Sequence, residues 1–142
     1  QGVSSAASDV YKRQNLHWGY DNRTTGLRIP DADPENYRIE NRFPGADVNP
    51  YLSIAATLAC GFLGMKNKVK PTNAYEGNAY EQDFDVPRNL EEALRGLQEN
   101  SEITQIFGDK FIQLYTSIKL VEFEQFNQVI SSWEREHLLL NV

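Results

Sequence analysis

The periodicity of the chain changes at Pro44-Gly45, and this change constrains the fold more than any other feature. Before it, the segments Thr25–Pro30 and Tyr37–Phe43 alternate charged and apolar residues, as strands with one buried face do. A turn-rich acidic connection joins them at residues 31–36. After the change, helix start signals dominate. We therefore predict an α+β fold in which two or more antiparallel strands precede a mostly helical C-terminal half.

The first helix is predicted at Pro50–Met65, because Asn49 is a good N-cap and proline suits the first helical position. Its many small residues would let another element pack closely against it. Cys60, the single cysteine, lies in this helix and is expected to be a packed thiol, which fits a reducing, cytosolic compartment. Residues 66–88, which include Pro71, Gly77 and Pro87, read as an irregular crossing.

The last third of the chain is predicted to be helical. Asn89 with Glu92, and Ser131 with Glu134, have the spacing of capping boxes, and Asp109 can cap a long helix between them. The predicted elements are Leu90–Asn100, Asp109–Ile130 and a short helix from Ser131. Five apolar residues of the long helix fall near one face, which we expect to be core: Phe111, Leu114, Ile118, Val121 and Phe126.

Net charge and hydropathy limit the function classes. The net charge of −6 and pI near 4.9 argue against general affinity for nucleic acid, which needs a surplus of lysine and arginine. The most apolar window, Tyr51–Met65, falls short of the ~20 residues that a membrane span needs.

Residues 1–14 lack usable periodicity and look like translated adaptor sequence. We interpret them as a non-native or disordered scar, with an ordinary flexible arm as the alternative, and assign the fold to residues 15–142.

Four arginines and one glutamate gather within twenty positions, at Arg23, Arg28, Arg38, Glu40 and Arg42. The planar arginine fork suits phosphate and carboxylate, and a carboxylate among arginines can ligate magnesium or manganese. Such a set serves phosphoryl transfer, which depends on positioning and charge neutralisation. The alternative is a solvent-facing strand with Arg–Glu–Arg salt bridges, each contributing ~0–1 kcal/mol. Spacing alone favours that alternative.

Three ordered motifs carry a resemblance to a known family. They are Asn-Arg-Thr-Thr-Gly-Leu-Arg-Ile-Pro at residues 22–30, Arg-Ile-Glu-Asn-Arg at residues 38–42 and Asn-Pro-Tyr-Leu at residues 49–52. Trp133-Glu134-Arg135 and the ending Leu140-Asn141-Val142 also resemble that family, which is the glutamine synthetase family. The similarity covers nearly all of residues 15–142. It implies the C-terminal part of a catalytic domain built on a curved antiparallel sheet backed by helices.

The resemblance also implies a role for each charged residue, with ATP and Mg²⁺ or Mn²⁺ as cofactors. Arg23 would contact the transferring phosphoryl group, Arg28 would hold the nucleotide's phosphates, and Arg38 would lie near the nucleotide. Glu40 would ligate the metal. Arg42 would orient the substrate glutamate and help to neutralise the acyl phosphate.

The activity implied is that of an ATP-dependent carboxylate–amine ligase. It would form γ-glutamyl phosphate and pass the γ-glutamyl group to ammonia or a polyamine, inside a cytoplasmic homo-oligomeric ring. Residues 18–23 and 133–137 favour the polyamine branch. Upstream metal and substrate residues are missing, so we expect a fragment that is inactive alone. The alternative is a non-catalytic anion-binding or scaffold relative, against which the presence of Glu40 counts.

Overall fold

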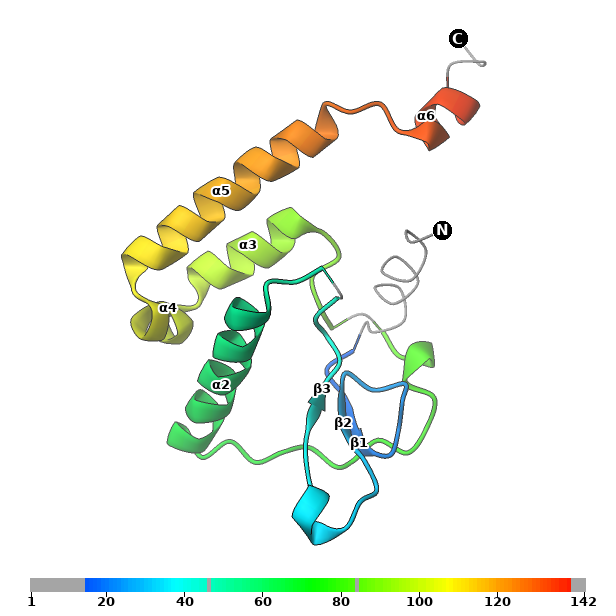
Figure 1. The fold of residues 1–142 in the computed structure, drawn as a ribbon, viewed down its shortest axis with the longest axis vertical. Coiled ribbons are helices and arrows are strands. Elements are labelled where there is room, and N and C mark those ends of the chain that lie inside the picture. Colours follow the sequence, from blue (N-terminus) through cyan, green and yellow to red (C-terminus); the bar gives the residue numbers. More distant parts are fainter. Residues whose placement is uncertain (1–14, 46, 84, 139–142) are drawn as a thin grey trace. The chain divides into compact units, whose positions relative to one another are not determined.

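A computed structural model describes residues 15–45, 47–83 and 85–138. The interpretation of residues 1–14 as a scar and the last residues of the family-like ending lie outside that range. The chain divides into two compact units, Gln1–Arg88 and Asn89–Val142, whose ribbons are coloured along the sequence in Figure 1. The first unit holds the sheet and one long helix, and the second consists of helices and short connections where it is described. The predicted α+β class is confirmed.

A three-stranded mixed sheet organises the first unit, in the order β1-β2-β3. Strand β1 (Trp18–Tyr20) runs parallel to β2 (Leu27–Ile29), and β2 runs antiparallel to β3 (Glu40–Asn41). The antiparallel pair was predicted, but β1 was not. The prediction of a strand over Tyr37–Phe43 is too long, since only Glu40–Asn41 pairs and the preceding turn contains the 3₁₀ helix η1 (Pro34–Asn36).

Helix α2 (Pro50–Lys66) begins where predicted, because the Asn49 side chain accepts hydrogen bonds from the backbone N–H groups of Tyr51 and Leu52. It connects to the sheet through Asn41, whose Nδ2 donates to the Thr57 hydroxyl over 2.9 Å. Ala59 is buried, but Cys60 is exposed, so the expectation of a packed thiol is wrong. Strand β3 therefore directs Asn41 toward the helix, and its neighbour Glu40 lies on the opposite face of the sheet.

Between α2 and the second unit, residues 67–78 follow the irregular crossing that was predicted, before the 3₁₀ helix η2 (Ala79–Glu81). This segment returns along β1, where the Tyr75 N–H donates to the Trp18 carbonyl over 2.8 Å and the Trp18 indole donates to the Thr72 carbonyl over 2.9 Å. The rings of His17 and Tyr75 stack at 4.6 Å. The crossing thus closes the open edge of the small sheet.

The second unit is a set of four helices where it is described: α3 (Leu90–Glu99), α4 (Ser101–Phe107), α5 (Asp109–Asn127) and α6 (Ser132–His137). Both predicted capping pairs are confirmed, since Asn89 accepts from the Glu92 N–H and Ser131 and Glu134 form a full capping box. Helix α4 was not predicted. It starts at its own cap, Asn100, and ends at Gly108, whose φ of 85° suits glycine.

Helix α5 differs from its prediction at both ends and in its buried face. Gly108, rather than Asp109, occupies the N-cap, and the helix ends at Asn127 instead of Ile130. Helices α3 and α4 pack against α5, where Leu94, Ile112 and Thr116 are buried. The stripe expected to be core is exposed: Phe111, Leu114, Ile118, Val121 and Phe126. No helix among the described residues is long and apolar enough to cross a membrane.

Candidate functional site

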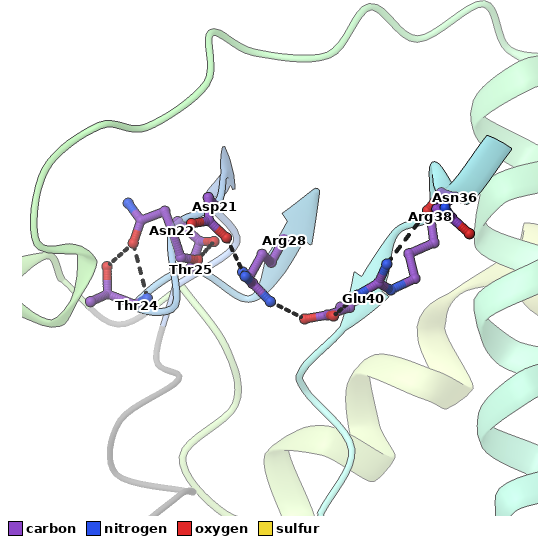
Figure 2. Close-up of polar contacts among 8 residues, drawn as sticks. All are labelled: Asp21, Asn22, Thr24, Thr25, Arg28, Asn36, Arg38 and Glu40. Carbon is purple, nitrogen blue, oxygen red and sulfur yellow. Dashed lines mark hydrogen bonds and ion pairs between the residues drawn. The ribbon is translucent and has the colours of Figure 1, made fainter. Parts of the chain in front are cut away.

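The charged residues of the two strand motifs meet across the sheet. Arg28 of β2 stands directly opposite Glu40 of β3, and its Nη1 donates to Glu40 Oε2 over 2.8 Å. On the far side of Glu40, Arg38 Nη2 lies 3.3 Å from Oε1. Figure 2 shows these side chains in a row. The structure therefore brings together three of the five predicted site residues.

A fourth member of the row, Asp21, was not predicted. Its carboxylate Oδ1 accepts a hydrogen bond from Arg28 Nη2, on the other side of the guanidinium from Glu40 (Figure 2). The result is a continuous charged row, Asp21–Arg28–Glu40–Arg38, in which acids and bases alternate. The Arg28 side chain is only 12% exposed, whereas that of Asp21 is 60% exposed. The most shielded member of the row is thus the arginine that both acids hold.

Pairing with Arg28 also sets the ionisation of the row. The hydrogen bond from Arg28 is the main cause that lowers the pKa of Asp21 and the pKa of Glu40 below their ordinary values. The same two bonds, with Asp21 first, raise the pKa of Arg28. All three groups therefore remain charged at neutral pH, and Glu40 is available as an ionised oxygen ligand.

One donor of Arg28 stays unused. Its Nε is buried and has no hydrogen-bond partner among the described residues. A buried donor without an acceptor costs free energy, and a phosphate oxygen is an acceptor that suits a guanidinium. An unused donor on Arg28 is compatible with the phosphate-holding role that the family resemblance implies for this residue, and that role stays a prediction.

The loop that carries Arg23 is held by its neighbours in the Asn22–Thr24 segment. Asn22 Nδ2 donates to the carbonyls of Tyr75 (3.0 Å) and Gly77 (2.9 Å), while its Oδ1 accepts from the Thr24 N–H over 2.9 Å. The Thr24 hydroxyl in turn accepts from the Ala79 N–H over 2.9 Å. The adjacent Thr25 is fully buried. The Asn-x-Thr-Thr run is a sequence signal for such a tied loop, but the strand prediction did not use it.

Arg23 itself is exposed and is one of the residues that line an open hollow. The others are Tyr20, Asp21, Asn22, Glu76 and Gly77. Its backbone carbonyl accepts from the Tyr80 hydroxyl over 3.3 Å. The charge of Arg23 helps to lower the pKa of Asp21, although less than Arg28 does. Arg23 thus lies at the Asp21 end of the charged row.

Arg42 lies just beyond β3, and its backbone N–H donates to the Gly26 carbonyl over 2.9 Å. That bond extends the contact between the two motif strands by one residue on each side. The predicted catalytic and substrate roles of Arg42 stay predictions, as do the roles given to Arg23, Arg28, Arg38 and Glu40.

A metal site is not complete within the described ranges. No group of three or more histidine, cysteine, aspartate or glutamate side chains there is arranged to hold an ion. Glu40 offers one hard oxygen ligand of the type that magnesium and manganese prefer. Glu40 is thus the one metal ligand that the family resemblance assigns among the described residues.

Comparison with known proteins gives a consistent result. The family description "Glutamine synthetase, catalytic domain" matches residues 7–138. The chain is 40% identical over 124 residues to a glutamate–isopropylamine ligase of a Pseudomonas species, which is 84% of this chain and 27% of that protein. It is 37% identical over 133 residues to the γ-glutamylputrescine synthetase PuuA of Escherichia coli, which is 93% of this chain and 28% of PuuA.

Other matches agree. A glutamine synthetase of Staphylococcus aureus is 31% identical over 133 residues, covering 87% of this chain and 30% of the enzyme. Among solved structures, "Apo GmaS without ligand" matches with a TM-score of 0.76 and 28% identity, over 90% of this chain and 30% of that one. The chain therefore spans less than a third of the length of these proteins. It belongs to the glutamine synthetase family and represents part of its catalytic domain.

Proposed function

We propose that the protein to which this chain belongs is an ATP-dependent ligase that joins an amine to the side-chain carboxylate of glutamate. The observation that carries the proposal is the charged row across β2 and β3, because it joins two family motifs through the Arg28–Glu40 pair at 2.8 Å. Paired arginines and an ionised acid supply the positioning and charge neutralisation that phosphoryl transfer requires.

In the proposed reaction, a γ-carboxylate oxygen of glutamate attacks the terminal phosphorus of ATP, and the bond to the bridging oxygen of ADP breaks. The amine nitrogen then attacks the acyl carbon, the bond to phosphate breaks, and the nitrogen loses a proton. Arg23 contacts the phosphoryl group in transfer, and Arg28 and Arg38 hold the nucleotide. Arg42 orients glutamate and neutralises the acyl phosphate.

Glu40 would hold a magnesium or manganese ion together with ligands from outside the described residues. Such an ion, when bound, neutralises phosphate charge. Arg28 and Arg38 both hold Glu40 in this structure, so their guanidinium groups are close to the place where that charge would lie. The roles proposed for Arg28, Arg38 and Glu40 require the two arginines to lie this close to the acid.

The amine is proposed to be an alkylamine or polyamine in preference to ammonia. Support comes from the relatives named for isopropylamine and putrescine, which share 40% and 37% identity with the chain, compared with 31% for the glutamine synthetase. We further propose that the whole protein assembles into a homo-oligomeric ring in the cytoplasm, as the family resemblance implies. This 142-residue chain is not expected to be active alone.

The test uses the full-length protein with glutamate, ATP and magnesium, and a panel of ammonia, putrescine, isopropylamine and ethanolamine. Phosphate release and the mass of the γ-glutamylamide product are measured for each amine. We expect amine-dependent phosphate release with at least one alkylamine above the ammonia rate. An assembled, folded protein that forms no product with any amine would instead support the scaffold alternative.

A further inference from the structure

Asp21 holds Arg28 from the side opposite Glu40, and this contact is separate from the motif residues whose roles the family resemblance supplies. Arg28 uses Nη1 for Glu40 and Nη2 for Asp21, so two acids fix the plane of one guanidinium group (Figure 2). An arginine that is 12% exposed can turn only if one of these contacts is released. Each acid therefore holds Arg28 through its own terminal nitrogen, and either contact can persist without the other.

The backbone of Asp21 is itself fixed. Its N–H donates to the Ile29 carbonyl over 2.8 Å, which ties it to the residue that follows Arg28 in β2. The next residue, Asn22, is tied to the Tyr75 and Gly77 carbonyls. Asp21 adopts a φ of 44°, a conformation that is uncommon for residues other than glycine, asparagine and aspartate. This constrained backbone keeps the Asp21 carboxylate in a defined position, from which it can orient the Arg28 side chain.

We propose that Asp21 is a positioning residue that keeps Arg28 oriented toward the nucleotide phosphates when Glu40 is occupied by the metal. This inference rests on the proposed function. If Glu40 held a metal ion, Asp21 would be the acid that still holds Arg28 through Nη2, and Nη1 would be able to donate to a phosphate oxygen.

Two effects of removing Asp21 oppose each other. Its negative charge disfavours a nearby phosphate, so its loss would tighten nucleotide binding. Its hydrogen bond orients Arg28, so its loss would weaken binding. The second effect is the larger one, because the Asp21 charge is neutralised by Arg28 and screened by solvent, whereas a displaced donor loses its contact with phosphate.

The experiment measures the affinity of the full-length protein for ADP and for a non-hydrolysable ATP analogue in magnesium, by calorimetric titration. Asp21→Ala should weaken nucleotide affinity about 10-fold or more, as expected for a mispositioned charge-assisted donor. Asp21→Asn, which keeps an acceptor without its charge, should fall between the wild type and the alanine variant. The affinity for glutamate and the midpoint of thermal unfolding are measured in parallel.

Asp33→Asn is the matched control, because Asp33 is exposed, makes no cap hydrogen bond with its side chain and undergoes the same change in charge. It should bind nucleotide as the wild type does. Unchanged or tighter nucleotide binding in Asp21→Ala and Asp21→Asn overturns the inference. So does an equal loss of nucleotide affinity, glutamate affinity and thermal stability, which would mark a structural role. If the wild type itself binds no nucleotide, it is the proposed function that fails.

Discussion

Arg28 and Glu40 face each other in register across two antiparallel strands, and their charged atoms are 2.8 Å apart. Each comes from a different family motif, twelve positions apart in the chain. Cross-strand neighbours on one face of a sheet interact directly, so the pair places both motifs on a common surface. Substitutions on this surface can therefore separate its role in catalysis from its role in the fold.

Replacing Glu40 with glutamine removes the charge and keeps the size of the side chain. In the full-length enzyme we expect turnover to fall at least ~10²-fold, as for loss of one preorganised electrostatic group. Manganese binding, followed by electron paramagnetic resonance, should weaken in the same variant. Near-normal turnover at limiting magnesium would mean that Glu40 is no metal ligand.

Arg42→Lys tests whether Arg42 acts on substrate or on structure. The change keeps the charge and loses the two-pronged donor geometry, so turnover and glutamate affinity should fall together. The midpoint of thermal unfolding should move little. Kinetics of glutamyl transfer and thermal unfolding are measured on the same full-length preparation. Normal kinetics with a large loss of stability would assign Arg42 to a structural ion pair.

Lowering the pH should decrease the stability of the first unit, in part because Asp21 becomes protonated. Because Arg28 lowers the pKa of Asp21 in the folded state, the unfolded chain binds more protons in the acidic range. The stabilisation is complete above the ordinary pKa of about 4 and is lost as pH falls through the lowered folded value. The midpoint of thermal unfolding, measured between neutral and acidic pH, should fall as this stabilisation is lost.

In that titration, Asp21→Asn should flatten the dependence on pH relative to Asp33→Asn. The slope should not vanish, because Glu40 is held by the same guanidinium and its pKa is lowered too. Identical curves for the two variants would show that the Asp21–Arg28 pair contributes nothing to stability in solution.

Two glycines should respond oppositely to alanine. At Gly19 a new Cβ would lie 2.6 Å from the Tyr75 carbonyl oxygen, so the crossing segment must move, at a cost of about 1–3 kcal/mol in stability. At Gly61, inside α2, a Cβ meets nothing within 4 Å, so alanine should stabilise the helix by up to about 1 kcal/mol. Denaturant unfolding of both variants checks the prediction, and an equal effect would contradict it.

Local signals explain what could be predicted. The helix starts at Asn49, Asn89 and Ser131 were correct because each cap is formed by residues within three positions of it. The meeting of Arg28 and Glu40 agrees with the predicted alternation, because alternation in two neighbouring strands places both side chains on one face. Their separate catalytic roles came from family resemblance and are still to be tested.

Contacts distant in sequence explain the errors. Strand β1 has three residues and is defined by parallel pairing with β2, which alternation does not reveal. Helix α5 has apolar residues on more than one face, so periodicity could not tell that Ile112 and Thr116 are buried while Leu114 and Ile118 are exposed. Asp21 was missed because Arg28, its partner seven positions away, is brought close by the same unpredicted pairing of β1 with β2.

The crossing at residues 72–79 holds the Arg23 loop with backbone atoms. The carbonyls of Thr72, Tyr75, Gly77 and Ala79 accept from Trp18, Asn22 and Asn15, and the N–H groups of Tyr75 and Ala79 donate back to β1 and Thr24. Every residue type has these backbone carbonyls. Evolution can therefore replace most side chains of this crossing, but an insertion or deletion within it would displace the partners on one side of the change from their positions along β1 and the Arg23 loop.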